Sequence, residues 1–378
     1  LEKAIKDEAE KAAKNLKGLP EGVTVTVTEV NTTPGTDKTG VQTPATVTVE
    51  YKDKDGNKIT KVIEVPVNVV SSTPPEVVVF EGDTPNSEDI KKGITPGEGG
   101  TVGDPTKVPS TVGKAGDKDV EVEVPVTYGN GKFKENVKVP VTVLPKPTAG
   151  SVTVPKDLSE KELKDKVGKD AENAINNEEF KKKLPEGATV KVDLTNVTLP
   201  KTSTPGKAGE VEVPVIYTVN GKEYKTTVKV PVTVVEGKEQ LIPVNPTEKP
   251  QARDSITPSD YPEGSTFEYK VPDGQTEPFD LTTVGDKPVT VVVKDKNGKV
   301  LVEVPATIKV VEAKPTPIET PVTKTPVTKD DIAKYVKVPE GGKVTKVENI
   351  PDLTIPGKKD PVKVTVELPN GKTTTVEV

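Results

Sequence analysis

Chemistry in this sequence has to come from carboxylates, lysines and tyrosines. The 378 residues include 53 Lys and Arg, 59 Asp and Glu and 7 Tyr, whereas Cys, His, Met and Trp are all at zero. Without an imidazole or a thiol, paired carboxylates remain as the main source of general acid–base chemistry. No such pair is singled out by its sequence context. The sequence therefore predicts that the protein is not an enzyme, and no catalytic or cofactor-binding residue is assigned.

Two acidic segments resemble the start of a calcium-binding loop. The segment Asp53-Lys54-Asp55-Gly56-Asn57 places oxygen ligands at alternating positions, and the segment from Asp295 to Gly298 is similar. Lys54, however, puts a cation among the expected ligands. We interpret both segments as β-hairpin turns and assign no metal site.

Aromatic side chains concentrate in one part of the chain. The group consists of Tyr261, Phe267, Tyr269 and Phe279. Exposed aromatic rings are favoured at protein and glycan sites, so this group is the candidate ligand-binding site. The alternative, which we favour, is an aromatic core that replaces valines. Arg253, the one arginine, is interpreted as an exposed linker residue.

The charge balance limits the classes of partner that the protein could bind. Net charge is −6, and bidentate recognition of phosphates or guanines is nearly excluded with one arginine. No apolar run approaches the roughly 20 residues of a membrane span, and Leu1 opens an amphipathic helix instead of a signal peptide. We expect a soluble monomer with neither a nucleic-acid nor a membrane partner.

A motif recurs five times and predicts a tandem array of small β-domains. The hairpin glycine follows a corner glycine by 34 residues in four units, as Gly22 and Gly56 illustrate, and by 30 in the last, between Gly341 and Gly371. The five hairpin glycines are Gly56, Gly131, Gly221, Gly298 and Gly371. We place the repeats at 1–70, 71–145, 146–236, 237–312 and 313–378, and call them the first to the fifth repeat.

Alternation of valine with polar residues predicts hairpins with one buried face. Val120, Val122, Val124 and Val126 illustrate the pattern before the turn at Gly131. Several prolines interrupt these strands. Because proline has no N–H for a strand ladder, we expect edge strands, whose exposed edges the prolines would guard, at Pro66, Pro125, Pro140, Pro214 and Pro231.

Helices are few. An apolar stripe predicts a helix over 1–17, and Ser159 with Glu162 forms a capping box, flanked by Leu158 and Leu163 as a hydrophobic staple. That helix is expected to reach about Val167, with helical structure resuming up to Lys183. Short helices are expected at Ser87 to Lys92, Pro258 to Tyr261 and Lys329 to Tyr335.

These repeats resemble Rib domains, which form the stalks of Gram-positive surface adhesins. The resemblance rests on the corners Leu19-Pro20-Glu21-Gly22, Leu184-Pro185-Glu186-Gly187, Thr33-Pro34-Gly35 and Thr204-Pro205-Gly206, and on the turn Val366-Glu367-Leu368-Pro369-Asn370-Gly371. No turn keeps the family's full Tyr-Pro-Asp-Gly string. The resemblance implies immunoglobulin-like sandwiches that act as a stiff extracellular spacer attached to a cell wall. It also raises an internal Lys–Asn isopeptide bond, which requires a buried Lys.

The resulting prediction is a mainly β, non-enzymatic stalk or spacer of five immunoglobulin-like β-sandwich domains with short helical inserts. Five units of roughly 30 Å each would extend on the order of 150 Å. The repeats share spacing and little else, which favours a computationally designed or redesigned sequence over a natural stalk fragment; a designed chain would be a soluble recombinant protein. The alternative function is an adhesin-type module that binds a protein or glycan through one repeat.

Overall fold

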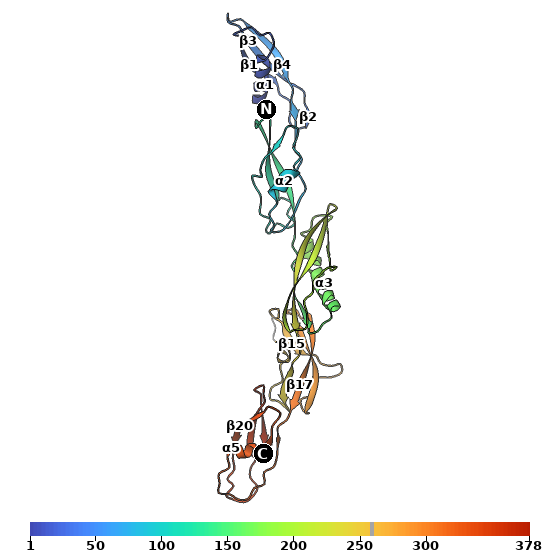
Figure 1. The fold of residues 1–378 in the computed structure, drawn as a ribbon, viewed down its shortest axis with the longest axis vertical. Coiled ribbons are helices and arrows are strands. Elements are labelled where there is room, and N and C mark those ends of the chain that lie inside the picture. Colours follow the sequence, from blue (N-terminus) through green and yellow to red (C-terminus); the bar gives the residue numbers. More distant parts are fainter. Residues whose placement is uncertain (258–260) are drawn as a thin grey trace. The chain divides into compact units, whose positions relative to one another are not determined.

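The computed structural model describes residues 1–257 and 261–378. The chain forms two compact units, Leu1–Lys146 with Glu178–Ala188, and Pro147–Asn177 with Thr189–Val378. Strands dominate both units and helices are few (Figure 1). The expected mainly β class is therefore confirmed, whereas the division into five immunoglobulin-like sandwiches stays a prediction. The short helix expected at Pro258 to Tyr261 falls largely outside the described residues.

In the first repeat, a helix covers a three-stranded sheet. Helix α1 (Glu2–Lys14) buries Ile5, Ala9 and Ala13 against valines of that sheet, as the apolar stripe predicted. The sheet has the order β1 (Thr24–Thr32), β3 (Ala45–Lys52) and β4 (Lys58–Val65), and a separate two-stranded pair joins β2 (Gly40–Val41) to β5 (Asn68–Val69).

The second, third and fourth repeats share one sheet plan. A long antiparallel hairpin is flanked by two short strands, one parallel and one antiparallel to it. In sheet order, the strands of the second repeat are β6 (Val77–Phe80), β9 (Phe133–Leu144), β8 (Glu121–Tyr128) and β7 (Thr101–Val102). Those of the third repeat are β10 (Val152–Pro155), β13 (Lys222–Val235), β12 (Gly206–Val219) and β11 (Thr189–Val192). Those of the fourth repeat are β14 (Glu239–Pro243), β17 (Val300–Val311), β16 (Gly285–Lys294) and β15 (Thr266–Tyr269).

The predicted hairpins are confirmed. Each hairpin glycine has a positive φ, from 79° at Gly221 to 87° at Gly56, a conformation that glycine adopts without steric cost. In the second repeat the alternating valines of β8, Val122, Val124 and Val126, are fully buried. Period-2 patterning thus identified the buried face correctly.

The edge-strand prediction for the prolines is wrong for Pro125, Pro140, Pro214 and Pro231. These residues lie in β8, β9, β12 and β13, the inner strands of their sheets. The prolines stand instead where a short outer strand ends or begins: parallel pairing with β6 starts at Val141, one residue beyond Pro140. The missing N–H is tolerated there because the neighbouring strand stops. Pro66 follows β4 and lies outside the strand.

The capped helices are confirmed, with longer bounds in one case. Helix α3 (Glu160–Asn176) begins after Ser159, whose hydroxyl accepts from the Glu162 N–H, and a short helix α4 (Glu178–Lys181) follows. The helix therefore continues past the predicted end at Val167. The described residues of the second and fourth repeats also form helix α2 (Ser87–Gly93) and the 3₁₀ helix η1 (Ala252–Ser255).

The fifth repeat has the smallest sheet. Its strands lie in the order β20 (Lys343–Glu348), β21 (Lys363–Glu367) and β22 (Thr373–Glu377), and β18 (Lys314–Pro315) pairs separately with β19 (Val336–Lys337). Helix α5 (Lys329–Ala333) begins at a Thr328 capping box. In place of a first strand parallel to the hairpin, this repeat has the proline-rich segment 315–326.

Candidate functional site

The aromatic candidates of the fourth repeat come together in two edge-to-face pairs. The rings of Tyr261 and Phe267 lie 5.0 Å apart at 84°, and those of Tyr269 and Phe279 lie 4.9 Å apart at 89°. This T-shaped geometry is a favourable one for aromatic pairs. All four side chains are half-buried and pack against the buried aliphatic residues of the repeat.

Arg253 is not the exposed linker residue that the sequence suggested. Its guanidinium lies over both rings of the first pair, 4.9 Å from the centroid of Tyr261 and 4.8 Å from that of Phe267. Helix η1 positions it there by burying the neighbouring Ala252 and Ser255. A cation over aromatic faces is attracted by their quadrupoles, so Arg253 covers the rings that a ligand would otherwise contact.

The Tyr269 hydroxyl is also hydrogen-bonded within the fourth repeat. It lies 2.7 Å from the Ser255 hydroxyl and donates to Gln240 Oε1 at 3.0 Å or to the Gln251 carbonyl at 3.1 Å. Burial raises the pKa of Tyr269 above its ordinary value, although the Ser255 hydrogen bond opposes the shift. These contacts favour the aromatic-core interpretation, and ligand binding by this group stays a hypothesis.

The two calcium-like segments form turns held by their own first carboxylate. Asp53 accepts hydrogen bonds from the N–H groups of Asp55 and Asn57, and Asp295 accepts from those of Asn297 and Lys299. Such bonds from a side chain to the next backbone amides are typical of Asx turns. A calcium-binding loop carries a glutamate at its twelfth position. Counted from Asp53, that residue is Glu64, which lies in strand β4 opposite Thr46.

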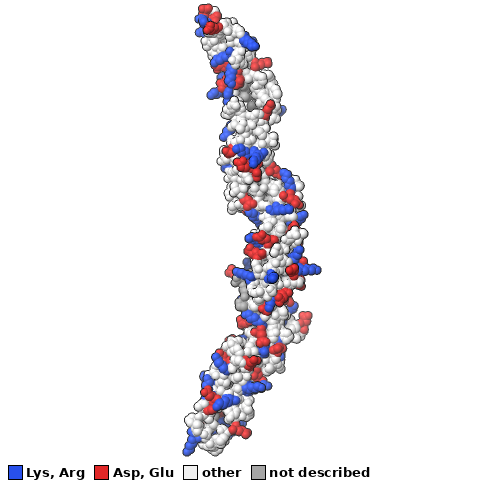
Figure 2. Space-filling model, in the orientation of Figure 1, with Lys and Arg blue, Asp and Glu red and all other residues white. Residues whose placement is uncertain are grey.

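The described residues contain no cluster of carboxylates that could hold a metal ion. Figure 2 shows basic and acidic side chains interspersed over the visible face, with no extended patch of one sign. Lysine is absent from the buried residues within the ranges described, so the buried Lys that an isopeptide bond requires is not found there. None of the described helices has the length and apolar character needed to cross a membrane.

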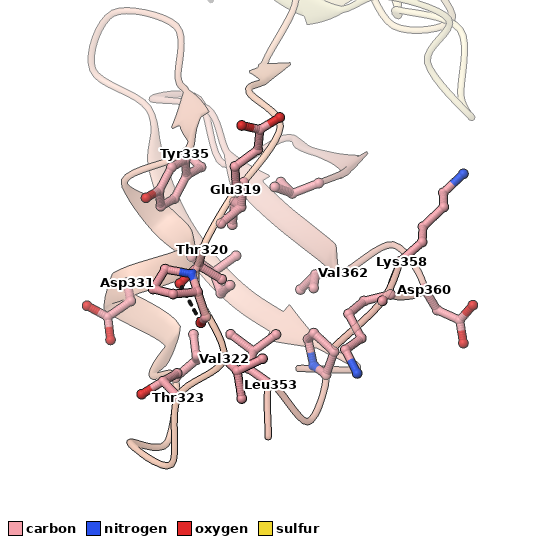
Figure 3. A pocket seen from close by; sticks show the side chains of 18 of the residues that line it. Glu319, Thr320, Val322, Thr323, Asp331, Tyr335, Leu353, Lys358, Asp360 and Val362 are labelled. Carbon is pink, nitrogen blue, oxygen red and sulfur yellow. Dashed lines mark hydrogen bonds between the residues drawn. The ribbon is translucent and has the colours of Figure 1, made fainter. Parts of the chain in front are cut away.

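A groove that the sequence did not predict lies in the fifth repeat. It has a volume of about 740 Å³ and is lined by the proline-rich segment, by residues 351–362 and by Val378. Val322, Leu353 and Val362 face the hollow, whereas Lys358 and Asp360 point outward (Figure 3). Val322 and Ile355 are 54% and 62% exposed. The sequence signals that could have indicated the groove are the density of prolines and the shorter glycine spacing of the fifth repeat.

The connector between the first and second repeats is fastened to the second. The Glu135 carboxylate accepts from the Ser72 N–H at 3.1 Å, from the Ser72 hydroxyl at 2.8 Å and from the Tyr128 hydroxyl at 2.7 Å. Burial acts to raise the pKa of Glu135, but the hydrogen bonds from Tyr128 and Ser72 outweigh it and hold that pKa below its ordinary value.

The connector between the third and fourth repeats is short and equally fastened. Val235, the last residue of β13, is buried in the hydrophobic cluster that includes Ala252 and Ile256 of the fourth repeat. The next residue, Glu236, exchanges hydrogen bonds with Thr257: its N–H donates to the threonine hydroxyl, and its carbonyl accepts from the threonine N–H. Strand β13 therefore leads directly into the fourth repeat, with no flexible linker between them.

A family model described as Rib domain matches residues 2–71 and 235–312, which are the first and fourth repeats. No curated protein matches the chain.

Similar solved structures include the protocadherin GammaB4 extracellular domain, at 11% identity and a TM-score of 0.15, with 76% of this chain and 61% of that one covered. A SusE-like surface located polysaccharide binding protein from Bacteroides thetaiotaomicron matches at 11% identity and a TM-score of 0.16, over 80% and 57% of the two chains. The sialic acid binding region of a Streptococcus sanguinis adhesin matches at 12% and 0.16, over 81% and 95%. This chain thus spans less than two thirds of the first two proteins.

Proposed function

Because residues 2–71 and 235–312 match the Rib domain family, we propose that the chain is a non-enzymatic stalk or spacer built from five repeats of this kind. Rib domains are structural repeats typical of cell-surface proteins, and this supports a role outside the cell. Each repeat would be an immunoglobulin-like module of the stalk. A designed chain would keep the spacer architecture as a soluble recombinant protein with no evolved activity.

The observation that carries the proposal is the fastening of the connectors. A spacer must transmit orientation from one repeat to the next, and flexible tethers do not do so. Here Ser72 is bound by Glu135, and Val235 is buried among side chains of the following repeat. The burial of Val235 would limit the rotation of the third repeat against the fourth, and the Ser72 hydrogen bonds would fix the start of the second repeat.

A distance measurement between spin labels tests the proposal. The chain has no cysteine, so Lys225→Cys in the third repeat and Lys270→Cys in the fourth, both exposed, introduce unique label sites. We expect a single narrow distance distribution, and a broad one when five Gly/Ser residues are inserted after Glu236. An equally broad distribution with and without the insertion would contradict the spacer function.

A further inference from the structure

Helix α3 carries one acidic side chain that is not exposed. Asp170 follows Val167 by three residues and precedes Ala174 by four, and both of these lie on the buried stripe of the helix. Since residues three and four apart share one face of a helix, this position turns the Asp170 carboxylate toward the interior of the third repeat. The remaining acidic residues of α3 are exposed, namely Glu160, Glu162, Asp165 and Glu172.

The Asp170 carboxylate has incomplete hydrogen bonding. The Gly150 N–H, in the segment before β10, donates to it. A Cβ at residue 150 would lie only 3.2 Å from Oδ1, so the carboxylate approaches this backbone closely. The second oxygen, Oδ2, is buried and has no hydrogen-bond partner among the described residues. A carboxylate that lacks part of its partners is costly to bury in its charged form.

A compensating positive charge comes from the fourth repeat. Strand β10 packs beside β17, which begins directly after the turn 295–299. Lys299, the last residue of this turn, is the cation that acts on the Asp170 carboxylate. The turn is held by Asp295, whose carboxylate accepts from the Lys299 N–H at 2.9 Å. An attraction between charges therefore links the helix of one repeat to the turn of the next.

Other charged groups around α3 are exposed or act elsewhere. The segment 147–155 carries no charged residue. On α3 itself, Lys166 and Lys169 are exposed. Charged side chains on and after the neighbouring strands have other partners: Glu210 and Glu212 pair with Lys229, and Lys191 and Lys225 act on Asp193. Within the part of the chain that the structure describes, Lys299 is thus the charge that a neighbouring element directs at Asp170.

Burial raises the pKa of Asp170 above its ordinary value, although the Gly150 hydrogen bond and the charge of Lys299 oppose the shift. Between the ordinary value and the raised one, the folded chain keeps a proton that the unfolded chain has lost. Stability therefore falls as pH rises through this range, and the penalty stays fully present above it. Lys299 reduces the penalty only while Asp170 is ionised, because a neutral carboxyl carries no charge to attract it.

We propose that Asp170 and Lys299 form a pH-dependent electrostatic coupling between the third and fourth repeats, which is present when Asp170 is ionised and absent when it is protonated. At neutral pH the packing of α3 depends on the turn of the following repeat, whereas at low pH it does not. The observations that carry the proposal are the buried, unpartnered Oδ2 and the cation that the next repeat supplies. The coupling deepens the spacer function and rests on it, since it gives one junction of the spacer a response to pH.

Hydrogen–deuterium exchange of the α3 peptides in the full chain tests the coupling, with all variants compared at the same pH. At pH 7, Asp170→Asn should slow this exchange about threefold or more, because it removes the buried charge. Asp165→Asn, at an exposed aspartate of the same helix, is the matched control and should exchange like the parent. At about pH 3, where Asp170 is protonated, all three chains should exchange alike.

A second measurement needs no change at Asp170. Lys299→Gln should speed the exchange of α3 about threefold or more at pH 7 and leave it unchanged at about pH 3. Lys296→Gln, at an exposed lysine of the same turn, is the control and should have no effect at either pH. In the Asp170→Asn background, Lys299→Gln should have no effect either, because its partner charge is gone.

Three results would overturn the coupling. One is an effect of Lys299→Gln that persists at low pH or in the Asp170→Asn background, which would make Lys299 a purely structural side chain. The second is the absence of any effect of Lys299→Gln at pH 7. The third is an Asp170→Asn chain whose α3 exchanges no more slowly than that of the parent at pH 7. A failure of the spacer function would appear separately, as a broad distance distribution between spin labels at residues 225 and 270 at every pH.

Discussion

At the scale of single residues, half-buried polar side chains distinguish the repeats from one another. Glu135 binds a connector, whereas the Tyr269 hydroxyl lies among Ser255, Gln240 and Gln251 inside the fourth repeat. A polar group left without its partner in such a place costs more than the hydrogen bond contributed. These residues are therefore the sensitive points of otherwise valine-based repeats.

Replacing Glu135 by Gln should destabilise the second repeat by about 1–2 kcal/mol, because the charged acceptor of the Ser72 and Tyr128 hydrogen bonds is lost and partial exposure moderates the effect. Thermal unfolding measures the change. Glu121→Gln, which breaks an exposed pair with Lys138, is the matched control and should shift stability by less than about 0.5 kcal/mol. Equal effects of the two variants would contradict the assigned role of Glu135.

The lowered pKa of Glu135 predicts that the stability of the second repeat depends on pH. The pKa of Glu135 is lowered in the folded chain, so its stabilising contribution is fully present above the ordinary glutamate pKa and is lost as pH falls through the lowered value. The stability difference between the parent and Glu135→Gln should therefore shrink from pH 7 to about pH 3. A difference that stays constant or grows over this range would show that the ionised carboxyl is not what matters.

Replacing Tyr269 by Phe should destabilise the fourth repeat by about 1–3 kcal/mol, because the buried Gln240 and Ser255 lose a hydrogen-bond partner. Tyr335→Phe, at an exposed tyrosine of the fifth repeat, is the control. A glycan array probed with the full chain and with Tyr269→Ala addresses the ligand hypothesis. Reproducible binding that Tyr269→Ala removes, with Tyr269→Phe equally stable to the parent, would favour a ligand site over an aromatic core.

At the scale of elements, the hairpins and capped helices followed from local sequence, whereas the outer strands did not. Alternating valines and a turn glycine specify a hairpin within about 25 residues, and Ser159 with Glu162 specifies the start of α3. Strands β6, β10 and β14 are short, and β6 pairs with Val141–Leu144, far along the chain. No local period reveals such a partner, which is why inner strands containing Pro140 or Pro231 were mistaken for edges. The groove escaped prediction for the same reason, since segments that are distant in the sequence line it.

The corrected position of the prolines changes the expected outcome of their replacement. Pro125, Pro140, Pro214 and Pro231 lie in inner strands beside the ends of short neighbours. A chain with valine at all four positions should keep its fold and sediment like the parent, because each new N–H group would lie beside the end of an outer strand and not along a continuous open edge. Increased self-association of this variant would restore the edge-strand interpretation.

Helix α3 offers a separate test of an element. Ser159→Ala removes the side-chain acceptor of the Glu162 N–H and should lower stability of the third repeat by about 0.5–2 kcal/mol. Ser203→Ala, at an exposed residue outside the helix, is the control. If the two variants unfold at the same temperature, the Ser159 cap does not stabilise this helix.

At the scale of the whole molecule, we propose that the chain is a series of repeats, with the connectors before the second and the fourth repeat held in place. The family match at 2–71 and 235–312, the common sheet plan of the second to fourth repeats and the buried Val235 all support this description. The fifth repeat keeps the hairpin, and a groove of about 740 Å³ lies within it. In the proposed stalk, contacts at the junctions between repeats would supply the stiffness.

Small-angle X-ray scattering of the full chain tests this central claim most directly. Five repeats of roughly 30 Å, joined end to end, predict a maximum dimension on the order of 150 Å and a radius of gyration of roughly 40 Å. A compact globule of this length would have a radius of gyration of only about 21 Å. A measured value near 40 Å, with the distance distribution of an elongated particle, is the predicted result. A value near 21 Å would contradict the spacer account.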